Sequence, residues 1–160
     1  MQKGLNEMNI QLDHVISDIT GVTGMNIIRA IITGERDTAK LASLRDHRIK
    51  SDISTIIKAL EGDYRGAHLH ILKQELESYE FYLKQIDECD KAIASCYQEF
   101  DTRKDVDTTY NKITYSTKRK NKNSPSFDLK SSLCTISGVD LSLIPGLSEL
   151  TIQTIISEVG

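Results

Sequence analysis

Residues 69–100 carry the pattern that most constrains the fold of this chain. Ten positions, spaced alternately three and four residues apart, form one stripe: Leu69, Leu72, Leu76, Tyr79, Leu83, Ile86, Asp90, Ile93, Tyr97 and Phe100. All but Asp90 are apolar or aromatic, and this heptad spacing predicts one helix packed along a seam. At 1.5 Å per residue the helix would be about 48 Å long, which is typical of a coiled-coil arm. We therefore expect the seam to be an assembly surface.

Asp90 is the exception on this seam. A carboxylate buried between helices costs on the order of several kcal/mol unless it is paired or reaches water. One interpretation is that Asp90 fixes the register of the helices. The other is that it lies at a wet part of the seam and extends into solvent.

A second apolar stripe precedes the arm. It repeats the same spacing within residues 2–19, at Leu5, Met8, Leu12, Val15 and Ile19. The spacing predicts a second heptad helix, which would share a seam with residues 69–100 within one chain or between two. The expected fold is therefore all-α, with a long antiparallel or dimeric coiled-coil arm beside a small block of short helices.

Composition agrees with an all-α chain. The 160 residues are 39% hydrophobic and contain no tryptophan and two prolines. Three cysteines without a CxxC pair predict neither a disulfide framework nor a zinc site, which favours a reducing cytoplasm. The sequence contains no run of 18 apolar residues, so no membrane span is predicted.

The block of short helices has two predicted N-caps. Asp37 would cap residues 38–44, and Ser51 would cap residues 52–60. Eight cations of this block could form a basic face: Arg29, Arg36, Lys40, Arg45, Arg48, Lys50, Lys58 and Arg65. Six acids lie among them, so an ordinary solvated surface is the alternative.

A glycine pair within residues 20–24 separates the first predicted helix from the next. Helix, hairpin, helix is the outline of a helix-hairpin-helix element, which binds phosphate through backbone amides at the start of its second helix. A plain helix reversal has the same outline. The candidate nucleic-acid-binding residues here are Gly21, Thr23, Gly24, Arg29 and Arg36.

The charge is unevenly distributed. Residues 103–122 hold seven bases and two acids, a local charge of +5, whereas the remainder holds 13 bases and 21 acids, or −8. Residues 104–126 lack periodicity and are predicted to be a basic, flexible linker between a helical region, 1–103, and a last segment, 127–160. Within the linker, Lys118, Arg119, Lys120 and Lys122 are candidate phosphate contacts, although a purely solvated linker also fits.

The last segment predicts a second helix-hairpin-helix-like element. A short helix is expected over residues 127–133, a turn at Pro145 and Gly146, and a helix over 149–158 capped by Ser148. Gly146 and Ser148 are the candidate nucleic-acid-binding residues. No catalytic motif or metal-ligand spacing accompanies them, so no catalytic or metal-binding residue is predicted.

Several stretches resemble the insertion sequence 110 family of transposases. Residues 8–12, 16–25, 28–31, 34–37, 59–62, 64–65 and 72–93 resemble the middle region of these enzymes. Residues 138–141, 144–146 and 156–160 resemble the start of the C-terminal transposase domain. The resemblance covers nearly the whole chain apart from the linker, and residues 8–37 are its most specific part.

The resemblance implies a role in DNA transposition guided by an RNA from the element. Family members carry acidic metal ligands, with Mg²⁺ as the expected ion, in an N-terminal RuvC-like domain, and a serine nucleophile in the C-terminal domain. By resemblance this chain is a fragment that contains neither the acidic metal ligands nor the serine nucleophile. Its expected partners are copies of itself, DNA and the element's RNA. Relatives tend to have Gly where this chain has Ser148 and Ala where it has Ile152, and the Cβ of Ser148 hinders a close approach of the backbone to a phosphate. A helical adaptor or scaffold without a nucleic-acid role is the alternative.

Overall fold

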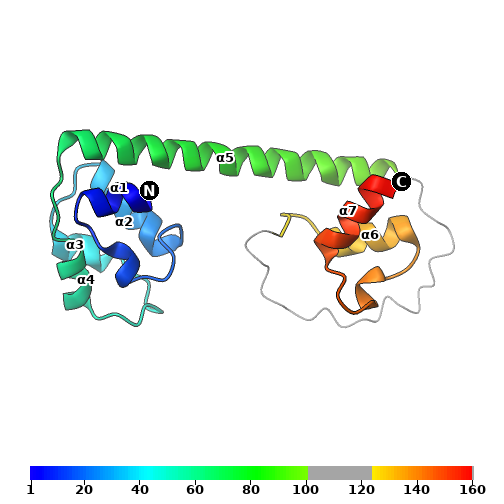
Figure 1. The fold of residues 1–160 in the computed structure, drawn as a ribbon, viewed down its shortest axis with the longest axis horizontal. Coiled ribbons are helices and arrows are strands. Elements are labelled where there is room, and N and C mark those ends of the chain that lie inside the picture. The colour runs from blue at the N-terminus through cyan, green and yellow to red at the C-terminus, as the bar shows by residue number, and fades with distance from the viewer. Residues whose placement is uncertain (101–123, 160) are drawn as a thin grey trace. The chain divides into compact units, whose positions relative to one another are not determined.

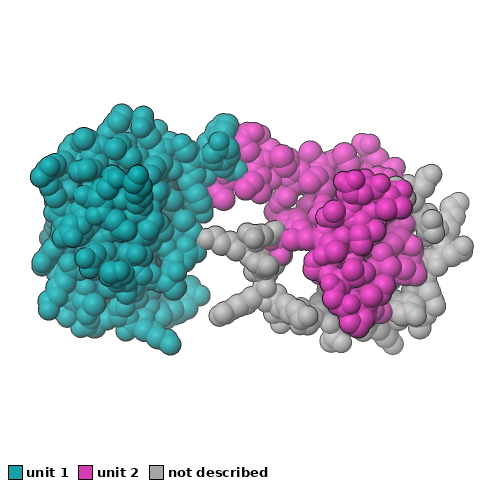
Figure 2. Space-filling view, viewed as in Figure 1, with its two compact units in different colours: residues 1–82 teal, residues 83–160 magenta. Residues whose placement is uncertain are grey.

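The computed structural model describes residues 1–100 and 124–159, and within these ranges it is all-helical, as predicted. The helices are α1 (Gln2–Glu7), α2 (Val22–Ile32), α3 (Thr38–Ser43), α4 (Ile53–Ala59), α5 (Gly66–Glu99), α6 (Leu129–Ser137) and α7 (Glu149–Val159) (Figure 1). In the same described ranges, two 3-10 turns accompany them, η1 (Leu12–His14) and η3 (Leu141–Leu143). The chain divides into two compact units, residues 1–82 and 83–160 (Figure 2), so the division falls inside α5.

The long helix predicted over residues 69–100 is confirmed. α5 is a single uninterrupted helix of 34 residues that starts three residues earlier than the seam and ends one residue before Phe100. After Gly66 it contains neither glycine nor proline, so nothing in its backbone breaks the hydrogen-bond ladder.

The prediction of one helix over residues 2–19 is wrong. α1 ends at Glu7, and Asn9 has a positive φ of 59°, which no α-helix contains. The backbone there bonds to a distant segment instead. The carbonyl of Met8 accepts a hydrogen bond of 2.8 Å from the N–H of Asp63, and the N–H of Gln11 donates one of 2.9 Å to the carbonyl of Ala59. These long-range bonds replace the helical ones.

The apolar residues of that stretch form the core of unit 1 instead of a seam. Leu5, Met8 and Leu12 are fully buried there. The core also takes buried side chains from four later helices: Met25, Ile27, Ile28, Ile31, Leu41, Ala42, Ile56, Leu72 and Leu76. Unit 1 is therefore a small helical domain built on the first three turns of α5.

The capping predictions were close. The Asp37 carboxylate accepts hydrogen bonds from the backbone N–H groups of Ala39 and Lys40, which starts α3 as expected. The cap of α4 is Asp52, not Ser51, so that prediction was off by one residue. The Ser51 hydroxyl donates instead to the carbonyl of Val15, 2.8 Å away.

Unit 2 has a smaller core beside the last turns of α5. Among the residues of unit 2 that the structure describes, the buried ones are Leu129, Leu133 and Ile152. Tyr97 of α5 packs against this core and meets the ring of Phe127 at 6.1 Å between centroids. Asp90 accepts a 2.7 Å hydrogen bond from the N–H of Ser126, so the seam carboxylate binds backbone within its own chain.

The heptad seam of α5 is thus divided among different surroundings. Leu69, Leu72, Leu76 and Tyr79 pack on the core of unit 1, and Tyr97 packs on the core of unit 2. Between them Leu83 and Ile86 are exposed, as is Phe100 beyond the helix. We call Tyr82, Leu83 and Ile86 the exposed stripe of α5, since all three are about half exposed or more.

Candidate nucleic-acid interface

The glycine pair at the start of α2 serves packing in unit 1. Gly21 is the N-cap of α2, with no side-chain cap, and is half-buried. Thr23 is 5% exposed, and its Oγ1 accepts a hydrogen bond of 2.8 Å from the N–H of Asp46. Gly24 is buried against the backbone of Ile19. Of the three candidate residues here, Gly21 is the one that reaches the surface.

Arg29 and Arg36 are both engaged within unit 1. Arg29 donates from Nη2 and Nε to one carboxylate oxygen of Glu80 in α5, at 2.7 and 3.1 Å. Arg36 donates from Nη1 to the carbonyl of Ile31 at 2.6 Å and lies over the ring of Tyr64, 4.9 Å from its centroid. Arg29 thereby ties α2 to α5, and Arg36 closes the last turn of α2.

Other cations of the possible basic face are also paired. Ion pairs join Lys40 to Glu35, Arg48 to Asp46 and Arg65 to Asp63. Hydrogen bonds from Arg48 hold the pKa of Asp46 well below its usual value, so this partner is charged at any ordinary pH. Arg45 donates to the carbonyl of Ser51 at 2.6 Å. This arrangement favours an ordinary solvated surface over a basic face.

The linker candidates Lys118, Arg119, Lys120 and Lys122 lie outside the described residues.

The structure brings Gly146 and Ser148 together at the turn that opens α7. Gly146 has a φ of 90° and open space around the position of a Cβ. The Ser148 hydroxyl accepts a 3.1 Å hydrogen bond from the N–H of Thr151, so this side chain caps α7 as predicted. We refer to residues 144–148 as the α7 turn.

The start of α7 presents hydrogen-bond donors. Within the described residues, the N–H groups of Ser148, Glu149 and Leu150 have no protein acceptor. Donors of this kind, with the positive end of the helix dipole behind them, suit an anion. The carboxylate of Glu149 lies in the same first turn and opposes that preference.

A buried carboxylate that precedes the α7 turn in the chain was not among the predicted site residues. The side chain of Asp140 is 5% exposed and receives Lys130 Nζ of α6 at 2.9 Å on Oδ2. Its Oδ1 accepts from the N–H and the hydroxyl of Ser142, at 3.0 and 2.5 Å. An Asp two residues before a Ser is a recognisable capping pattern, but the pairing with Lys130 has no local signature.

Asp140 and Lys130 both keep their charges near neutral pH. Burial by itself raises the pKa of Asp140, but hydrogen bonds from Ser142 and Lys130 outweigh it and lower the pKa overall. Hydrogen bonding to Asp140 raises the pKa of Lys130. Burial and the neighbouring Asp140 raise the pKa of the Cys134 thiol, which disfavours the reactive thiolate.

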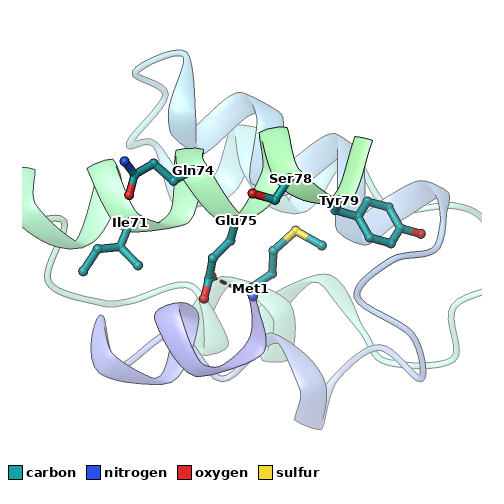
Figure 3. Close-up of a pocket in the computed structure, with 6 residues that line it drawn as sticks. All are labelled: Met1, Ile71, Gln74, Glu75, Ser78 and Tyr79. Carbon is teal, nitrogen blue, oxygen red and sulfur yellow. Dashed lines mark ion pairs between the residues drawn. The ribbon is translucent and has the colours of Figure 1, made fainter. Parts of the chain in front are cut away.

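Unit 1 has an open groove of about 420 Å³ between the start of α1 and α5. Figure 3 shows its lining residues: Met1, Ile71, Gln74, Glu75, Ser78 and Tyr79. The Met1 amino group and a Glu75 carboxylate oxygen face each other there at 2.6 Å (Figure 3). The groove lacks basic side chains, so it does not suit a phosphate.

Neither a metal site nor a membrane span occurs within the described parts of the chain. No three His, Cys, Asp or Glu side chains gather there where they could hold a metal ion. No helix in those parts has the length and apolar character needed to span a membrane.

No known protein family, curated protein or solved structure matches this chain.

Proposed function

We propose that this chain contributes nucleic-acid binding and self-assembly to DNA transposition by a transposase of the insertion sequence 110 type, without catalytic residues of its own. The α7 turn is the observation that carries the proposal. It combines an open glycine at Gly146 with backbone N–H donors at the start of an 11-residue helix. A phosphate of DNA or of a structured RNA is the ligand that such donors suit.

The packing around this turn supports a helix-hairpin-helix-like role. α6, η3 and α7 enclose one small core, and Ile152 is buried in it. Ser148 uses its hydroxyl on Thr151, which leaves the earlier N–H groups of α7 for a ligand. The two departures from the family pattern, Ser148 and Ile152, are thus compatible with a phosphate contact at the turn.

The charge distribution supports the same proposal. The basic residues of 103–122 precede α6 in the chain, whereas the remainder is acidic. Such basic side chains would add phosphate contacts that are independent of the nucleic-acid sequence.

A salt titration of the full chain with duplex DNA and with structured RNA tests the proposal. Binding should weaken steeply with salt, because each neutralised phosphate releases counterions. Replacing Lys118, Arg119, Lys120 and Lys122 with Gln should lower the slope of log affinity against log salt by about 3 to 4. The matched control replaces Lys73, Lys84 and Lys91, which pair with acids along α5, and should leave the slope nearly unchanged.

The alternative is a helical adaptor without a nucleic-acid role, and the exposed stripe of α5 favours it. Exposed apolar side chains on a helix are typical of a protein-binding surface. A defined dimer in sedimentation, with no binding to DNA or RNA at low salt, would support the adaptor and contradict the proposal.

A further inference from the structure

We infer that Asp140, held by Lys130, is the residue that positions the α7 turn for its nucleic-acid ligand. The inference rests on the proposed function and names a residue that the resemblance does not assign to binding. Asp140 does not lie on the turn and is almost fully buried, so it would act through the backbone and not by contact with the ligand.

The carboxylate of Asp140 joins two elements. Oδ2 meets the ammonium of Lys130, which projects from the first turn of α6. Oδ1 takes both the N–H and the hydroxyl of Ser142, which lies in η3. One side chain therefore sets how η3 leaves α6. Because η3 ends at Leu143, directly before the α7 turn, the orientation of η3 is passed on to the turn.

Apolar packing around the turn leaves room for this role. Leu143 and Ile144 are about half exposed, so they add little to holding the turn. Leu141 before the turn and Leu147 within it are the residues that pack against the core of unit 2. Backbone hydrogen bonds from Ile144 to Leu141 and from Leu147 to Ile144 close the turn itself. The Asp140 carboxylate adds the polar link between η3 and α6.

The pair also decides what Lys130 does. Its ammonium forms an ion pair with Asp140 and is therefore not a free cation for a phosphate. Loss of the carboxylate would release a positive charge close to the proposed site. If Asp140 positions the α7 turn, its loss should weaken nucleic-acid binding. If Lys130 instead binds the phosphate directly, loss of Asp140 should strengthen that binding.

The test measures the affinity of the full chain for duplex DNA at fixed salt in Asp140→Asn. Positioning predicts binding weaker by about fivefold or more, equivalent to about 1 kcal/mol. Lys130→Met should weaken binding similarly, and Lys130→Arg, which keeps the ion pair, should restore it. Unchanged or tighter binding in Asp140→Asn would overturn the inference, since a freed Lys130 would then be the better explanation.

Two controls separate positioning from unfolding and from failure of the proposed function. Circular dichroism should show unchanged helix content in Asp140→Asn, while amide exchange speeds up at residues 141–144 and 146–148. If this variant unfolds, Ser142→Ala replaces it. We then expect a smaller loss of affinity for DNA, and an unchanged affinity would contradict the inference.

If the unmodified chain does not bind DNA, the proposed function falls and this inference with it. If it binds and the variants bind equally, the inference alone falls.

Discussion

The backbone of Ile19 occupies the space that a Cβ on residue 24 would need. Gly24 therefore lets the chain before α2 cross the first turn of that helix at close range. The requirement for glycine at this position comes from packing in unit 1 and holds whether or not a phosphate binds near Gly21.

Gly24→Ala should destabilise unit 1 by about 1 to 3 kcal/mol, because an added methyl group must push two backbone segments apart. Chemical denaturation followed by circular dichroism measures this change. Gly66→Ala is the matched control, since nothing lies near its Cβ position at the start of α5, and its stability should stay equal or rise slightly. Equal stability of both variants would contradict the close crossing.

Two leucines of one heptad seam should respond differently to truncation. Leu72 is 0% exposed and Leu83 is 47% exposed, although both lie on the heptad seam of α5. Leu72→Ala should cost about 2 to 5 kcal/mol of unfolding free energy, and Leu83→Ala less than about 1. Chemical denaturation at low protein concentration gives both changes in unfolding free energy.

Leu83→Ala also tests self-assembly through the exposed stripe. If copies pair there, this variant should shift the oligomeric state measured by sedimentation while the unfolding of a dilute sample changes little. An unchanged oligomeric state would remove the stripe from the assembly surface.

Acid should weaken unit 2 through Asp140. Its pKa in the folded chain lies below the usual 3.8, so its charged form stabilises the fold. This contribution is complete above the unfolded-state pKa and is lost as the pH falls through the folded-state pKa. Asp140→Asn should be less stable at neutral pH and lose less on acidification below about pH 4. Amide NMR signals of α6 report both. A steeper acid loss in the variant would contradict this assignment.

Removing the acid at the start of α7 should strengthen the proposed phosphate contact. Glu149→Gln takes a negative charge from the first turn, where a bound phosphate would lie. We expect DNA affinity to rise about two- to fivefold, from 0.3 to 1 kcal/mol, while α7 loses a similar stability because the dipole loses its partner. Lys130 lies near this carboxylate and does not change the sign of either effect. Weaker binding in this variant would place the ligand elsewhere.

Local features of the chain could be predicted because their causes are local. The heptad spacing and the lack of helix breakers were enough to predict α5, and Asp37 and Ser148 were recognisable caps for α3 and α7. Each depends on residues within a few positions of one another. The turn at Pro145 and Gly146 was predicted in the same way, since it is encoded by its own residues.

Tertiary structure decided which apolar stripe stayed on one continuous helix and which was broken up into a core. The same three-four spacing occurs in residues 2–19 and in α5, yet the first is interrupted at Asn9 because Met8 and Gln11 bond to residues 59–63. The partners of Arg29 and of Asp140 were equally invisible to local patterns, since they lie 51 and 10 residues away. Spacing reports which side chains must leave water, whereas the surface that receives them depends on distant segments and exists only in the folded chain.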